Sequence, residues 1–302
     1  MKNIFFAICF FISFSVFGVC GAETRTISVS IEPVKFLVEK IAGDKFILNL
    51  LVPPNSDPHT FELKPKQLIK YGNSKYYFSI GDSFESVWLK KLLGINKDIK
   101  VYHIDKGVEK IFSDDEHHHD EHHHSEAEID DELHNENDGE KKHYNYDPHI
   151  WFSVKNARII IKNIYSALAE IDPDNREYYY ENYKLVDLSL SKLDNYINEK
   201  IKNSGVKKML VYHPILGYFA RDYNLIQLSI EEEGKEPSLK HMKNVIDIAK
   251  RDNIKFIFVQ PQINSKVVDV IARDINGKIV MIDPLKYDYL TELKRIAETF
   301  YE

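Results

Sequence analysis

The sequence predicts an α/β protein of two Rossmann-like lobes, each built on a parallel sheet, joined by one long linker helix. Three features lead to this prediction. The chain of 302 residues is long enough for two domains of ordinary size. Short β-rich runs alternate with helical patterns in two separate blocks, which is typical of parallel sheets covered by helices. Between the blocks, an uninterrupted helical pattern of roughly 30 residues is longer than one small domain needs.

The amino terminus has the pattern of a secretory signal peptide over residues 1–22. Lys2 supplies the charged start, and the apolar run over residues 4–19 is short for a permanent membrane anchor. Small residues follow at Cys20, Gly21 and Ala22, so we expect cleavage after Ala22 and export to the periplasm. Lipid attachment at Cys20 is the alternative. No second apolar run of membrane length follows in the sequence.

Residues 23–172 are expected to form the amino-terminal lobe. Pro33 can open its first helix, because proline is tolerated at the first helical position. The β-rich runs predict strands at residues 26–31, 46–52, 76–80 and 99–103. The helical patterns predict helices at residues 33–41, 65–71, 84–93 and 154–171. Alternation of this kind places the strands in one parallel sheet.

The composition changes abruptly inside this lobe, over residues 113–146. Acidic residues are frequent there and almost nothing could form a core, so we expect a disordered, solvated loop. Histidine runs of this kind bind divalent transition metals weakly, and we expect them to gather metal near the protein. The runs comprise His117, His118, His119, His122, His123 and His124. A solvated linker with incidental metal affinity is the alternative.

The long linker helix is predicted over residues 173–203. It restarts at Pro173 after a break, and no glycine or further proline interrupts the pattern as far as Lys202. Apolar residues recur at intervals of three and four positions and form one stripe. The stripe comprises Tyr179, Tyr183, Val186, Leu190, Leu193 and Ile197. A helix of about 30 residues is about 45 Å long, which suits a strut between two domains.

Residues 204–302 are expected to form the carboxy-terminal lobe, where the alternation of strand and helix resumes. The predicted strands cover residues 208–212, 225–230, 254–259 and 278–282. The predicted helices cover residues 216–222, 238–251, 265–274 and 290–301. Ser238 has the side chain of a helix cap at the start of the second of these helices.

Charge and cysteine content restrict the chemistry of the chain. A formal net charge of −7 argues against nucleic acid as a partner, because phosphate binding needs a basic face. Both cysteines, Cys9 and Cys20, lie in the expected signal peptide. After cleavage at Ala22 the mature protein has no disulfide and no thiolate, so any metal must be bound by histidine and carboxylate side chains.

Four candidate ligands stand at the ends of predicted elements, where open α/β sheets bind their ligands. His59 follows the second strand, and His149 ends the acidic loop before a helix. His213 and Asp283 follow the first and last strands of the second lobe. Each side chain has a neighbouring proline, which stiffens the backbone that aims it. Three neutral imidazoles and one carboxylate make a closed tetrahedral zinc site.

The spacing alone leaves other interpretations of these residues open. A single histidine after a strand is more often a satisfied polar residue than a ligand, and Asp-Pro is a common turn initiator. Repetition favours the metal site. The tripeptide Asp-Pro-His occurs twice in the same lobe, ending at His59 and at His149, each time at an expected strand–helix boundary.

The chain resembles the metal-binding solute receptors of ABC transporters, and within them the zinc-uptake branch. Matching motifs run from about residue 26 to the end of the chain: Pro53-Pro54 through Asp57-Pro58-His59-Thr60-Phe61-Glu62, Asp147-Pro148-His149-Ile150-Trp151, Tyr212-His213-Pro214, Gly217-Tyr218-Phe219, Glu236-Pro237-Ser238 and Ile282-Asp283-Pro284-Leu285. A histidine-rich acidic insert before the second ligand is similar to that of zinc members.

The resemblance implies a fold, a partner and a ligand set. The fold is two α/β lobes joined by one rigid helix, and the partner is an ABC permease in the membrane. The implied metal ligands are His59, His149, His213 and Asp283. Manganese members usually carry glutamate at the third position, so His213 implies Zn²⁺ as the cargo, because nitrogen ligands favour the softer ion.

The chain departs from the family pattern at two points. Members often carry Glu-Pro-Gln where this chain has Gln260-Pro261-Gln262, which puts a charge role at Gln260 in doubt. The disulfide of some zinc members is impossible in the mature chain.

These features are compatible with three functions. The first is a monomeric zinc receptor, not an enzyme, that reaches the membrane only by docking on its permease or through a lipid anchor at Cys20. The second is a secreted zinc hydrolase, which would need an open coordination position and a general base. Neither His-Glu-x-x-His nor Gly-x-Ser-x-Gly occurs in the sequence. The third is a surface adhesin or metal buffer that works through the histidine-rich loop.

Overall fold

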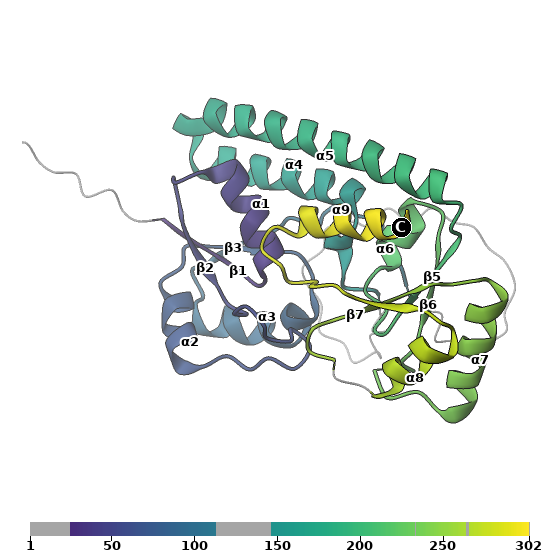
Figure 1. Cartoon of the computed structure of the whole chain (residues 1–302). Helices are drawn as coiled ribbons and strands as arrows, with labels where there is room; N and C mark the ends of the chain where they lie inside the picture. The colour runs from purple at the N-terminus through teal and green to yellow at the C-terminus, as the bar shows by residue number, and fades with distance from the viewer. Residues whose placement is uncertain (1–24, 113–145, 233, 264–265, 302) are drawn as a thin grey trace, which may run out of the picture.

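The computed structural model describes residues 25–112, 146–232, 234–263 and 266–301. Within them, two parallel sheets form the centres of two lobes, and a long helix runs across both (Figure 1). The predicted fold class is therefore confirmed. The expected signal peptide, the alternative lipid site at Cys20 and the histidine runs of residues 117–124 lie outside the described residues.

The amino-terminal lobe holds four parallel strands in the order β2-β1-β3-β4. The strands are β1 (Thr26–Val29), β2 (Ile47–Leu50), β3 (Tyr76–Ser79) and β4 (Lys100–His103). The helices are α1 (Glu32–Ala42), α2 (Pro65–Gly72), α3 (Ser83–Ile95) and α4 (Val154–Ile171), with a 3-10 turn η1 (Ile150–Phe152) before α4. Pro33 lies in the first turn of α1, as its missing N–H permits.

A 3-10 turn η2 (Pro173–Asn175) precedes the long helix α5 (Arg176–Ser204), which has 29 residues. The helix ends at Gly205, whose φ of 70° is the left-handed conformation that glycine adopts at low cost. Its predicted apolar stripe faces the protein, because Tyr179, Leu190 and Ile197 are fully buried. Helix α5 contacts α4 and α1 of the first lobe and α9 (Tyr289–Thr299) of the other lobe.

The carboxy-terminal lobe repeats the arrangement, with four parallel strands in the order β6-β5-β7-β8. The strands are β5 (Lys208–Val211), β6 (Ile226–Ser229), β7 (Phe256–Val259) and β8 (Lys278–Met281). The helices are α6 (Gly217–Asp222), α7 (Leu239–Arg251), α8 (Lys266–Asp274) and α9 (Tyr289–Thr299). The Ser238 side chain caps α7 by accepting from the His241 N–H, as predicted.

Apolar packing joins the two lobes. One hydrophobic cluster contains residues of both, and Phe36 of α1 meets Tyr289 of α9 edge to face at 6.1 Å. A smaller cluster fills the space between the second sheet and helices α7 and α8. Because dense packing resists deformation, the shared cluster fixes the distance between residues that the two sheets present to one another.

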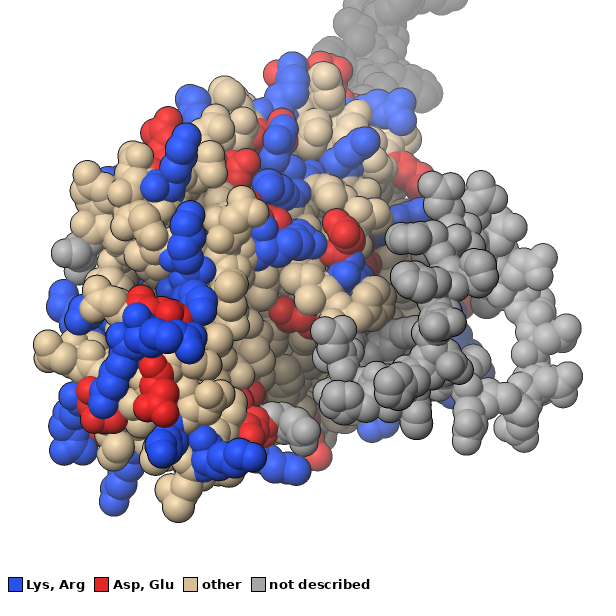
Figure 2. All heavy atoms as spheres, turned by 90° about the vertical axis from the view of Figure 1, so that its right-hand side faces the viewer, with Lys and Arg blue, Asp and Glu red and all other residues tan. Residues whose placement is uncertain are grey.

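The described surface carries both signs of charge. Figure 2 shows many Lys and Arg side chains on the face at the right-hand side of Figure 1, with Asp and Glu scattered among them. Among the described helices, none combines the length and the apolar character that a membrane crossing requires.

Candidate metal centre

The two Asp-Pro-His segments contain the same local hydrogen bond. After β2, the Asp57 side chain accepts a hydrogen bond from the His59 N–H at 2.9 Å. Before η1, the Asp147 side chain accepts one from the His149 N–H at 2.9 Å. In each turn the aspartate side chain accepts a hydrogen bond from the backbone N–H two residues later, and the proline between them restricts φ. The two tripeptides therefore position the imidazoles of His59 and His149 through the same local hydrogen bond.

His213 comes from the other lobe, just beyond the carboxyl end of β5. Its carbonyl accepts from the Ile215 N–H at 2.8 Å, which forms a tight turn around Pro214. Its Nδ1 lies 2.5 Å from Oε1 of Glu231, which stands just beyond the end of the neighbouring strand β6. Parallel strands bring these two carboxyl ends to the same edge of the sheet, as the rule for open α/β sheets predicts.

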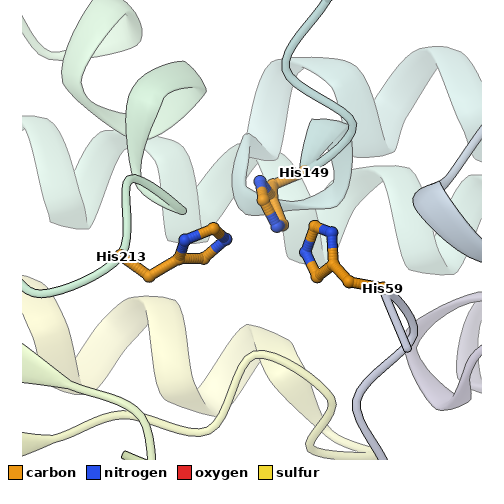
Figure 3. Close-up of side chains that lie close together, drawn as sticks. All are labelled: His59, His149 and His213. Carbon is orange, nitrogen blue, oxygen red and sulfur yellow. The ribbon is translucent and has the colours of Figure 1, made fainter. Parts of the chain in front are cut away.

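The three imidazoles meet between the lobes, facing one another (Figure 3). Their ring centroids are 5.2 Å apart for His59 and His213, 5.3 Å for His149 and His213, and 5.5 Å for His59 and His149. One nitrogen of each ring lies within 4.8 Å of the others. A tetrahedral zinc site needs about 3.4 Å between nitrogens, given Zn–N bonds of about 2.0–2.1 Å, so a small contraction would bring all three into bonding distance.

Carboxylates fix two of the three imidazoles. Nδ1 of His149 lies 2.7 Å from Asp147 Oδ1, and Nδ1 of His213 faces Glu231. An imidazole that donates Nδ1–H to a carboxylate keeps a lone pair on Nε2 and becomes a better metal ligand. The Nε2 of His213 fits this role, because it is buried and has no hydrogen-bond partner among the described residues.

His59 differs from the other two, because it is the exposed member of the cluster. Its pKa is lowered from the usual value of 6.5, first by desolvation and then by the neighbouring imidazoles of His149 and His213. A lowered pKa keeps the ring neutral near pH 7, which is the state that binds a metal.

Asp283 does not belong to the cluster, although the residues that follow it line the same cavity. It follows β8 by two residues, its N–H donates to Glu292 Oε1 at 3.1 Å, and its Oδ1 accepts from the Leu285 N–H at 3.0 Å. The next residue, Pro284, accepts a hydrogen bond from the Trp151 indole at 2.9 Å, two residues beyond His149. The structure therefore brings three of the four predicted ligands together and holds the fourth on an adjoining segment.

Two cavities flank the three imidazoles. One, of about 340 Å³, is lined by them together with Trp151, Glu231, Gln260 and the Pro284–Leu285 segment. The other, of about 720 Å³, shares the histidines and extends past Asp82, Tyr146 and Gly217. The three imidazoles therefore line both cavities.

Some supporting residues escaped the sequence analysis. Glu231 was not among the candidate ligands, and Asp147 appeared only within the repeated Asp-Pro-His tripeptide. Glu231 could have been found by the same rule that found His213, because it also stands at the carboxyl end of a predicted strand. Gln260 was noted only as a departure from a family pattern, although it follows β7 directly.

Comparison with known proteins supports a metal-binding protein. A family model described as zinc-uptake complex component A, periplasmic, matches residues 27–302. The high-affinity zinc uptake system protein ZnuA of Bacillus subtilis is 28% identical over 259 residues, which cover 84% of this chain and 76% of that protein. The manganese ABC transporter substrate-binding lipoprotein PsaA of Streptococcus anginosus is 25% identical over 280 residues, 88% of this chain and 81% of that protein.

Solved structures agree with the sequence comparison. A crystal structure of ZnuA superposes with a TM-score of 0.79 at 34% sequence identity, over 92% of this chain and 98% of that one. The similarity therefore extends over both lobes and the long helix. Proteins of this kind are extracytoplasmic metal-binding receptors that serve ABC import, not enzymes, which excludes the hydrolase alternative. The chain thus belongs to the family of periplasmic A components of zinc-uptake complexes.

Proposed function

We propose that this receptor captures Zn²⁺ and delivers it to an ABC permease, with the ion held by His59, His149, His213 and Asp283. The observation that carries the proposal is the convergence of three imidazoles, with ligand atoms within 4.8 Å of one another, two of them fixed by carboxylates. Neutral imidazole suits zinc, and four ligands close a tetrahedral shell.

Zinc is preferred to manganese because of the donor set. Mn²⁺ is best served by carboxylate, carbonyl and water oxygens, whereas three nitrogen donors favour ions later in the first transition row. The relatives include a zinc uptake protein and a manganese transporter protein.

Asp283 would complete the shell when the ion arrives. Its Oδ1 is anchored by the Leu285 N–H, and the second oxygen is the one that would turn towards the histidines. The metal would then be bound by two residues of the second lobe, His213 and Asp283. Release would follow when docking on the permease moves one of these segments.

The histidine runs of residues 117–124 would raise the local concentration of metal, and the protein would act in the periplasm, either free or anchored through Cys20. We propose that it works as a monomer, because one chain supplies all four ligands.

The proposal is tested by competitive titration of the mature protein with Zn²⁺ and Mn²⁺, beside His59→Ala, His213→Ala and Asp283→Ala. We expect one tightly bound zinc, a preference over manganese, and affinity at least about tenfold weaker in both histidine variants. His103→Ala is the matched control, since this exposed histidine at the end of β4 lies outside the cluster. Wild-type affinity in both histidine variants would refute the site, and wild-type affinity in Asp283→Ala would remove the aspartate from the ligand set.

A further inference from the structure

The side chain of Gln260 is a buried polar group in the wall of the metal cavity. Only 6% of its surface is exposed, and its Oε1 has no hydrogen-bond partner among the described residues. It lines the same cavity of about 340 Å³ as the three imidazoles. Leaving a buried acceptor unpaired costs about 1–3 kcal/mol, so its presence here calls for a physical reason.

The topology puts Gln260 where this fold class binds ligands. Gln260 directly follows β7, and His213 follows β5 by two residues. These two strands are neighbours in the sheet, while the chain leaves β5 for β6 on its other side. The carboxyl ends of β5 and β7 therefore flank the point where the strand order reverses, which is the ligand crevice of open α/β sheets.

Two unsatisfied atoms belong to residues that line this cavity, and they need the same kind of partner. With Nδ1 bound to Glu231, the Nε2 of His213 offers a lone pair, and the amide oxygen of Gln260 offers another. Two acceptors do not satisfy one another. A cation, or a cation with a bound water that donates a hydrogen bond, satisfies both.

We propose that Gln260 is a specificity-determining residue of the cargo site, whose side-chain oxygen contacts the bound ion or a water molecule on it. This inference rests on the proposed function and adds to it an oxygen contact outside the four expected ligands. The contact is uncharged, so it stabilises a cation less than a carboxylate at the same place would.

The consequence is a selective effect on different metals. Zinc reaches a full shell with four protein ligands, so a further oxygen adds little to its affinity. Manganese prefers oxygen donors, so it gains more from the Gln260 oxygen and would gain still more from a carboxylate there. The neutral amide therefore keeps manganese binding weaker than a glutamate would.

The test is chelator competition with Zn²⁺ and Mn²⁺ on the mature wild-type protein, Gln260→Leu and Gln260→Glu. Gln262→Leu and Gln262→Glu are matched controls, because Gln262 lines the same cavity but is exposed. We expect Gln260→Leu to weaken Mn²⁺ binding about tenfold and Zn²⁺ binding less than about threefold, in the range of outer-shell effects. Gln260→Glu should strengthen Mn²⁺ binding about tenfold, and the Gln262 variants should match wild type.

The ratio of zinc to manganese affinity decides the outcome, because a merely structural role would change both affinities alike. A ratio within twofold of wild type in both Gln260 variants overturns the inference. If Gln260→Leu does not fold, the isosteric Gln260→Glu decides alone. A wild-type protein without a tight zinc site would instead refute the proposed function, while intact zinc binding with an unchanged ratio refutes only the role of Gln260.

Discussion

At the scale of single residues, the side chains of Asp147 and Glu231 contact Nδ1 of His149 and of His213. Glu231 orients His213 and increases the electron density that its Nε2 offers to a metal. Glu231→Gln removes the charge while keeping the size, so we expect zinc affinity to fall about tenfold, with little change in thermal stability. Chelator competition measures the first quantity and thermal unfolding the second.

Glu232→Gln is the matched control for this prediction. The Glu232 carboxylate accepts a hydrogen bond from the Ser238 N–H at the start of α7 and does not contact His213. Equal zinc affinities in Glu231→Gln and Glu232→Gln would mean that the Glu231–His213 contact does not support metal binding.

At the scale of elements, the amino terminus of α3 holds a buried acidic pair. Asp82 caps the helix by accepting from the Glu85 N–H, and Glu85 accepts from Tyr77, Ser79 and backbone N–H groups. Burial and the charge of Glu85 raise the pKa of Asp82 to about 8. Burial also raises the pKa of Glu85, although its hydrogen bonds oppose this effect. The fold therefore holds a proton that the unfolded chain releases near pH 4.

This pair makes stability depend on pH in a defined direction. An acid with a raised pKa stabilises the fold fully below its unfolded value, and that contribution is lost as the pH rises towards its folded value of about 8. Asp82→Asn keeps a side chain that can cap the helix and removes the ionisable carboxyl group. We expect the variant to be more stable than wild type by about 1 kcal/mol or more at pH 8, with the difference shrinking towards pH 5. Denaturant unfolding at several pH values measures this.

Asp288→Asn provides the comparison, because Asp288 caps α9 in the same manner but is only half-buried. A difference between Asp82→Asn and wild type that stays constant from pH 5 to pH 8 would contradict a buried protonated pair.

At the scale of the whole molecule, the sequence predicted the fold better than the site. The eight strands found in the described residues and the long helix were expected within a few residues, because hydrophobic periodicity is local information. His59, His149 and His213 were expected for the same reason, since each ends a recognisable element. The contacts of Glu231 with His213 and of Gln260 with the cavity depend on how strands far apart in sequence pair, which no local pattern contains.

The remaining question at this scale is whether the tight site depends on the histidine-rich segment. Phe112 and Tyr146 flank that segment and pair in an antiparallel bridge, and the Tyr146 hydroxyl donates to the Gly81 carbonyl at 3.0 Å. The two ends are therefore held side by side by the described protein. Replacing residues 114–144 with a short Gly-Ser linker should leave both ends, and the three imidazoles, in place.

We expect the shortened protein to keep one tight zinc within about threefold of the wild-type affinity, because the four proposed ligands all lie outside the replaced residues. The weaker zinc ions that the wild type takes up should be lost, as counted by isothermal titration calorimetry. A full-length variant with the six histidines at 117–119 and 122–124 replaced by asparagine separates imidazole binding from attraction by the acidic residues. If tight binding disappears with the segment, the protein is a metal buffer that works through its loop, and the clustered imidazoles serve the fold instead.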